Sequence, residues 1–215
     1  HWVKVNSRIK VRDQESFPLA EDAGQVMLEE STDQTPMLFA MVWDASKAHR
    51  RIFVDERDWG LQACQPDKSV DEIWLNKVGT YGMGSASHWW GRLAALLIRL
   101  CHQMIRARHS GWIYVDDFLW RLPREYACTM MTLLTLFLRA LGVRLSWGKL
   151  ASGLRMQWMG IIVDFHWEVW MLPPDKQARI AAFLLAVAGA GDDLERKTIE
   201  SGIGLLVWCV RAWPY

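Results

Sequence analysis

The chain has 215 residues, of which 51% are hydrophobic and 23% are charged, and its formal net charge is +1. This length is typical of one domain or a closely joined pair, and the composition can form a core, which excludes a disordered tail. No apolar run approaches the ~20 residues of a membrane span, so a transmembrane protein is excluded. The scattered cysteines form neither a zinc motif nor a disulfide framework and indicate a reducing compartment; they are Cys64, Cys101, Cys128 and Cys209.

The basic residues are concentrated in the middle of the chain. Residues 73–163 contain eleven Lys and Arg but only three acidic residues, of which two form the adjacent pair Asp116–Asp117, whereas residues 1–42 are acidic overall. This distribution is compatible with solvated helix faces. It is equally compatible with a groove for a polyanion, in which the carboxylate pair is kept for a metal.

The first half of the chain mixes predicted strands with a long helix. The near-continuous apolar run 37–43 predicts a strand buried on both faces, ending at Asp44. Residues 51–54 and 61–64 are predicted as two further strands joined by the charged turn 55–58. The apolar spacing over 85–108 predicts an amphipathic helix, which Ser85 or Ser87 would cap.

The second half continues this alternation and ends in helices. Residues 111–120 predict a β-hairpin with Asp116 and Asp117 at its tip, and residues 125–141 predict a helix ended by Gly142. A second hairpin is predicted from strands 157–163 and 168–172. After Pro173 and Pro174, helices are predicted over 175–190 and 193–213. The mixed order predicts the α+β class.

Three carboxylates are the candidates for chemistry: Asp44, Asp116 and Asp117. Phosphoryl transfer with two Mg²⁺ ions requires acidic oxygens that converge from separate strands and hold the ions ~3.5–4 Å apart. An Asp-Asp pair alone is a weak signal. Here an apolar strand leads into the pair and another leaves it, which favours a catalytic interpretation.

Several segments, taken in chain order, resemble the motifs of reverse transcriptases. Tyr114-Val-Asp-Asp117 resembles the catalytic box, and Asp44-Ala-Ser-Lys-Ala-His49 resembles the first palm motif. Residues 80–87 resemble the motif that touches template and incoming nucleotide, and residues 141–149 the motif whose lysine approaches the triphosphate. Residues 158–161 resemble the primer grip. Residues 196–211 resemble the thumb helix of tyrosine-recombinase (DIRS-like) retroelements, the branch to which the resemblance is closest.

The resemblance implies a right-hand polymerase palm, an antiparallel sheet backed by helices, over residues 37–172. Residues 1–36 would be a partial fingers segment, and residues 173–215 the helical start of the thumb. The implied activity is that of an RNA-directed DNA polymerase of a retrotransposon. It would act on an RNA or DNA template with a primer and deoxynucleoside triphosphates, as part of a longer polyprotein. A retroelement life cycle implies an intracellular location, in nucleus or cytoplasm.

The resemblance also implies roles for individual residues. The metal ligands would be Asp44, Asp116 and Asp117, holding two Mg²⁺ ions, with Mn²⁺ as an alternative, and Lys149 would assist the leaving pyrophosphate. Nucleotide and template would be contacted by His49, Gly82, Ser85 and Tyr114. The primer grip would consist of Trp158, Met159 and Gly160.

The chain departs from the family in two places. His49 stands where reverse transcriptases usually have the Tyr or Phe that excludes a 2′-hydroxyl, which leaves the choice between deoxynucleotides and ribonucleotides open. The fingers segment is short, so its triphosphate-binding cations would be Lys4, Arg8, Lys10 and Arg12. Two alternatives therefore stay open: an RNA-dependent RNA polymerase, and a decayed palm that serves as a nucleic-acid-binding or scaffold module.

Overall fold

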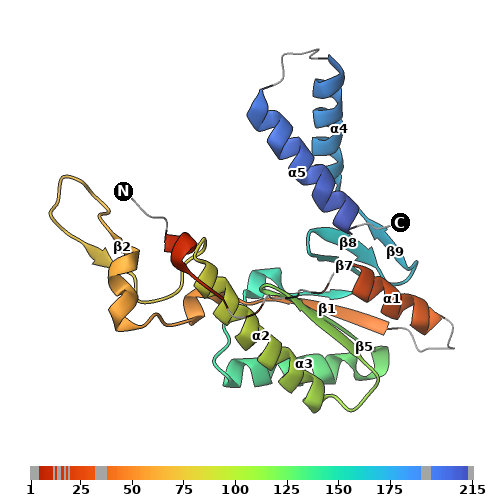
Figure 1. Ribbon diagram of the computed structural model, residues 1–215. Coiled ribbons are helices and arrows are strands. Elements are labelled where there is room, and N and C mark those ends of the chain that lie inside the picture. Colours follow the sequence, from red (N-terminus) through yellow and green to blue (C-terminus); the bar gives the residue numbers. More distant parts are fainter. Residues whose placement is uncertain are drawn as a thin grey trace.

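The centre of the molecule is a four-stranded antiparallel sheet (Figure 1). The structure is a computed structural model, and it describes residues 5–11, 13, 16, 18, 20–31, 38–189 and 195–212. The strand order is β4-β5-β1-β6, formed by β1 (Leu38–Asp44), β4 (Ser110–Tyr114), β5 (Asp117–Pro123) and β6 (Ala151–Gly153). Helices α2 (Gly84–Met104) and α3 (Arg124–Ala140) cover one face. The opposite face is covered by α1 (Ala20–Ser31) and a three-stranded sheet. This is the α+β palm architecture that the sequence predicted.

Strand β1 is buried on both faces, as predicted from its near-continuous apolar run. Met41 and Trp43 pack into the cluster under α2 and α3, whereas Ala40 and Val42 pack into the cluster on the opposite face. A strand between two apolar layers needs no polar alternation. Met37, the first residue of the predicted strand, lies outside the described residues. Strand β6, which pairs with β1, was not predicted.

The two helices under the sheet occur where predicted, with corrected ends. Helix α2 starts after Met83, without a side-chain cap, so the predicted caps Ser85 and Ser87 are wrong; it ends at Met104 instead of Arg108. Helix α3 ends as predicted. Gly142 has a φ of 81°, and its amide donates to a carbonyl in the last turn of α3 at 3.0 Å, as in a left-handed C-cap.

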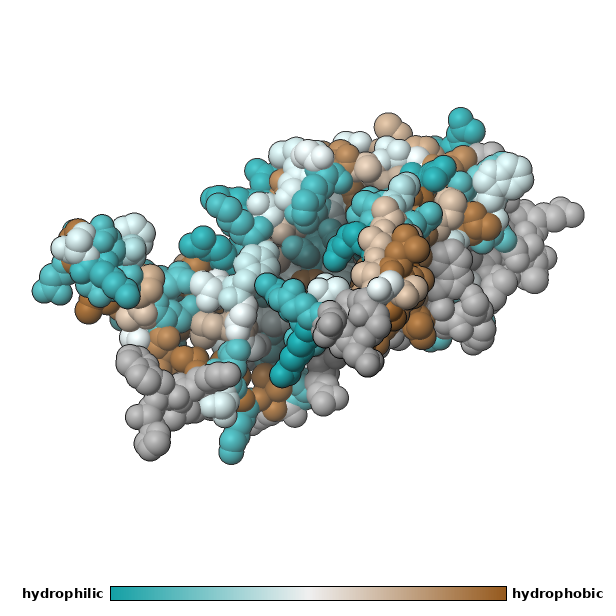
Figure 2. Space-filling model, turned by 90° about the horizontal axis from the view of Figure 1, so that it is seen from above, coloured by the Kyte–Doolittle hydropathy of each residue, from teal (hydrophilic) through white to brown (hydrophobic). Residues whose placement is uncertain are grey.

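Of the two strands predicted between β1 and α2, residues 51–54 form only an isolated bridge at Phe53, and residues 61–64 form a strand only at Ala63–Cys64. The segment contains 3-10 helices over Ala48–Arg51 and Glu56–Gln62, and only the short strands β2 (Ala63–Cys64) and β3 (Trp74–Leu75). The Asp55 carboxylate accepts a hydrogen bond from the backbone amide of Arg57 at 3.0 Å and starts the second of these helices. Such local bonding competes with strand formation. The segment forms the extension at the left of Figure 1. On the face of the molecule seen in Figure 2, hydrophobic residues are scattered among hydrophilic ones.

The C-terminal third also differs from the prediction. The predicted strand 157–163 is two strands, β7 (Arg155–Trp158) and β8 (Ile161–Asp164), because Met159 and Gly160 turn the chain with φ values of 52° and 75°. Strand β9 (Val169–Met171) completes this small sheet. Helices α4 (Pro174–Gly189) and α5 (Arg196–Ala212) follow and project from the sheets (Figure 1).

Some predictions fall on residues that the structure does not describe. The last residues of both predicted C-terminal helices do so, as do Lys4 and Arg12 of the fingers segment. Helix α1, within that segment, was not predicted. Among the described helices, none is both long and apolar enough to cross a membrane.

Candidate metal and nucleotide site

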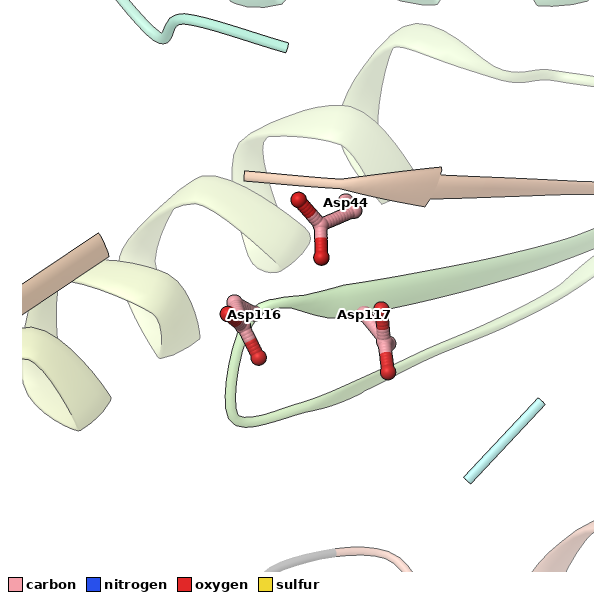
Figure 3. A group of neighbouring side chains, drawn as sticks. All are labelled: Asp44, Asp116 and Asp117. Atoms are coloured by element: carbon pink, nitrogen blue, oxygen red, sulfur yellow. The ribbon is translucent and has the colours of Figure 1, made fainter. Parts of the chain in front are cut away.

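The three carboxylates that the sequence singled out lie together at one end of the central sheet (Figure 3). Asp44 is the last residue of β1 and pairs in register with Asp117, the first residue of β5, while Asp116 lies in the turn before β5. One oxygen from each side chain lies within 4.8 Å of the others. The amide of Ala45 donates to the carbonyl of Asp116 at 2.8 Å, which ties the turn to the end of β1.

The turn that carries Asp116 has an unusual backbone conformation. Val115 has a φ of 54°, a left-handed conformation that a β-branched side chain rarely adopts. The buried Trp90 on α2 donates from its indole nitrogen to the Val115 carbonyl at 2.7 Å. Strained backbone persists only where surrounding contacts determine it, and helix α2 supplies such a contact here.

Asp44 is held by the segment that follows α3. The hydroxyl of Ser146 donates to Asp44 Oδ1 at 2.5 Å, and the ammonium of Lys149 contacts Oδ2 at 2.5 Å. The Ser146 amide also donates to the Asp44 carbonyl at 2.9 Å. The structure thus places Lys149 at the carboxylates, whereas sequence reasoning did not single out Ser146. Its only signal was its position within the motif 141–149.

Burial and neighbouring negative charge raise the proton affinity of Asp116 and Asp117. Burial, followed by the negative charges of Asp116 and Asp44, raises the pKa of Asp117 to about 6. The pKa of Asp116 is raised as well, first by burial and then by the charge of Asp44. The hydrogen bond to Asp44 raises the pKa of Lys149, which keeps it protonated at neutral pH. Three crowded oxygen donors of this kind fit a hard divalent cation such as Mg²⁺ or Mn²⁺, which would relieve the repulsion.

His49 lies close to the carboxylates but is not open to solvent. Its side chain is only 8% exposed, and its ring packs edge-on against Tyr81 with 4.6 Å between ring centroids. The structure therefore places the His49 ring against Tyr81 and away from solvent, and its contact with a nucleotide stays a prediction. Sequence reasoning missed Tyr81, although it lies in the motif 80–87.

The remaining predicted nucleotide contacts lie in two places. Gly82, with a φ of 88°, and Ser85 lie at the start of α2, where the side chain of Asn6 donates to the Gly82 carbonyl at 2.5 Å. Tyr114 is the last residue of β4 and packs, partly buried, against the core cluster that contains Trp158. Gly82 and Ser85 thus belong to the start of α2, and Tyr114 to the opposite face of the central sheet.

The predicted primer grip is a hairpin turn backed by a buried tryptophan. Trp158 is 1% exposed and donates from its indole nitrogen to the Asp117 carbonyl at 3.2 Å, so its side chain supports the hairpin that carries the carboxylates. Met159 and Gly160 form the turn. A Cβ at Gly160 would lie 2.3 Å from the ammonium of Lys176, which itself lies 3.3 Å from the ring centroid of Trp208. The turn therefore contacts both C-terminal helices.

Comparison with solved structures defines the class of fold, a reverse-transcriptase-like polymerase fold. The chain is similar to apo telomerase from Candida tropicalis truncated from its C-terminal domain, with a TM-score of 0.52 and 8% identity over 71% of this chain and 40% of that one. Apo telomerase from the same organism matches with a TM-score of 0.52 and 10% identity, over 71% of this chain and 35% of that one.

Telomerase from Candida albicans, in complex with the TWJ fragment of telomeric RNA, matches with a TM-score of 0.51 and 12% identity. That match covers 91% of this chain and 41% of the telomerase, so the chain spans less than half the length of each of these proteins. At such identities the likeness shows the fold alone. No protein-family model and no curated protein matches the sequence.

Proposed function

We propose that this chain is the palm of an RNA-directed DNA polymerase that transfers nucleotides with the help of two divalent cations. The observation that carries the proposal is the convergence of Asp44, Asp116 and Asp117 within 4.8 Å on a polymerase-like fold. Nucleic acid and deoxynucleoside triphosphates are then its substrates. A retrotransposon polyprotein as its source, and the tyrosine-recombinase branch in particular, rest on the sequence resemblance alone.

The chemistry follows from the donors at the site. The primer 3′-hydroxyl attacks the α-phosphorus of the nucleotide, the new P–O bond forms, and the bond to pyrophosphate breaks. Two Mg²⁺ ions, or Mn²⁺, held by Asp44 and Asp116 with Asp117 beside them, would supply Lewis-acid chemistry there. The hydroxyl proton passes to water. Lys149, kept protonated by Asp44, provides a positive charge and a proton donor for the leaving pyrophosphate.

The test is primer extension on an RNA template, with separate reactions for deoxynucleotides and ribonucleotides. It compares the unmutated chain with Asp116→Asn and with Asp58→Asn, a control in an exposed 3-10 helix. Extension with deoxynucleotides that is lost only in Asp116→Asn supports the proposal, and a preference for ribonucleotides supports an RNA polymerase instead.

A second measurement addresses the case in which turnover requires further domains of a longer protein. Mn²⁺ binding is titrated with the same three proteins. If there is no extension, and Mn²⁺ binding is absent or equal in all three, the non-catalytic scaffold is adopted.

A further inference from the structure

An exposed aromatic ring packs against the buried histidine that was expected to face the sugar. Tyr81 is 63% exposed, whereas His49 beneath it is 8% exposed, and the two rings meet at an interplanar angle of 89°. Among the described residues, neither ring nitrogen of His49 has a hydrogen-bond partner. The His49 ring thus packs against Tyr81, and both of its nitrogens are buried away from an incoming ligand.

The loop that carries Tyr81 is fixed from both sides. Gly79 donates to the Ile52 carbonyl at 2.8 Å, and a Cβ at Gly79 would lie 2.6 Å from the carbonyl oxygen of His49, so only glycine allows this close approach. On the other side, Asn6 accepts a hydrogen bond from the Gly84 amide at 3.1 Å. The ring is therefore presented by an anchored turn.

Tyr81 is linked to the carboxylates through His49, which follows Asp44 by five residues and whose ring Tyr81 contacts. Burial raises the pKa of the Tyr81 phenol, and the negative charges of Asp116 and Asp44 raise it further. In a bound nucleoside triphosphate, only the 5′-oxygen and the 5′-carbon separate the α-phosphorus from the ribose ring. A nucleotide that reacts at the carboxylates must therefore bring its ribose next to them.

We propose that Tyr81, in place of His49, is the specificity-determining residue that contacts the ribose and excludes a 2′-hydroxyl. This inference rests on the proposed function. The phenol ring fills the space that a 2′-hydroxyl would need, and the His49 ring below prevents it from retreating. Tyr81→Phe keeps the ring and should keep the selectivity. Tyr81→Ala opens the space and should lose it.

The test measures binding and does not require turnover. Dissociation constants for dATP and for ATP are measured in Mg²⁺ by isothermal titration with the unmutated chain, Tyr81→Ala and Tyr81→Phe. Tyr126→Ala is the matched control, because Tyr126 is 47% exposed on α3. We expect Tyr81→Ala to reduce the preference for dATP over ATP about tenfold, the order expected when one small group is accommodated or rejected. Tyr81→Phe and Tyr126→Ala should leave it unchanged.

The outcomes separate this inference from the function on which it rests. One outcome overturns the role of Tyr81 alone. In it, Asp116→Asn loses nucleotide binding, while the ratio of the dissociation constants for dATP and ATP is equal in the unmutated chain and in Tyr81→Ala. Absence of nucleotide binding by the unmutated chain, or binding that Asp116→Asn leaves intact, overturns the proposed function and the inference together.

Discussion

Replacing Asp117 by asparagine is expected to stabilise the metal-free chain at neutral pH. The pKa of Asp117, about 6, lies above the ordinary value of 3.8 because burial and two neighbouring aspartates oppose its charge. At about 1.4 kcal/mol for each tenfold change in proton affinity, this difference amounts to about 3 kcal/mol against the ionised folded state at pH 7. Since Asp117 is only half-buried, screening by solvent reduces the expected gain to about 1–2 kcal/mol.

The sign of the effect depends on pH. A folded-state pKa above the unfolded value means that the proton favours folding, so this stabilisation is fully present below about pH 4 and is lost as the pH rises through about 6. Asparagine is neutral throughout and can still donate to Asp44. Asp117→Asn should therefore be more stable than the unmutated chain at pH 7.5, and the difference should vanish near pH 4.

The assay is urea unfolding in EDTA at several pH values between 4 and 7.5, with Asp58→Asn as the exposed control. Adding Mg²⁺ at pH 7.5 should reverse the order, because the cation stabilises only the chain that retains its full set of ligands. Equal stabilities of Asp117→Asn and the unmutated chain at pH 7.5 would refute the reasoning. So would a difference that does not change with pH, since neither result is compatible with a strained carboxylate cluster.

Three further outcomes follow from particular contacts. Lys149→Met should bind Mn²⁺ about fivefold more tightly, because removing its ion pair frees the β1 carboxylate; equal or weaker binding in a Mn²⁺ titration contradicts this. Gly111→Ala should lose about 2–3 kcal/mol in urea unfolding, because its Cβ would lie 2.3 Å from the buried Trp120 ring, whereas Gly148→Ala, with open space around it, should change little. Trp90→Phe should cost about 1–2 kcal/mol and weaken Mn²⁺ binding, because the turn that carries Asp116 loses its hydrogen-bond donor; stability that falls without any change in Mn²⁺ affinity would show that the turn keeps its shape alone.

The parts of the fold that sequence patterns could predict are those with a regular period or a clear stop. The buried strand before Asp44, the hairpin around Asp116, and the helix ended by Gly142 all carry such signals. The convergence of Asp44 with the hairpin tip was implied by the ordered motifs, because period and stop signals do not say which strands pair. The order of the reverse-transcriptase-like motifs predicted that Lys149 lies near the carboxylates. The periodicity of hydrophobic residues carries no such information.

The errors have local physical causes. The turn at Met159 was hidden because an apolar residue in a left-handed conformation leaves no polar signature between two apolar strands. The segment after His49 reads as strands by its β-branched and aromatic residues, but the side chain of Asp55 starts a 3-10 helix instead. That Tyr81 covers His49 is a tertiary contact between segments before and after the extension, which no local pattern encodes.

The position of β1 within the sheet has a consequence for the lifetime of the site. β1 is an interior strand, hydrogen-bonded to β5 on one side and to β6 on the other. Each of its amides points to one neighbour, and those that face β5 can exchange with solvent deuterium only when the long ladder from Leu38 to Asp44 opens, an event close to complete unfolding. These amides should therefore be among the slowest to exchange, and Asp44 should remain in place through the local opening events that release the extension or the C-terminal helices.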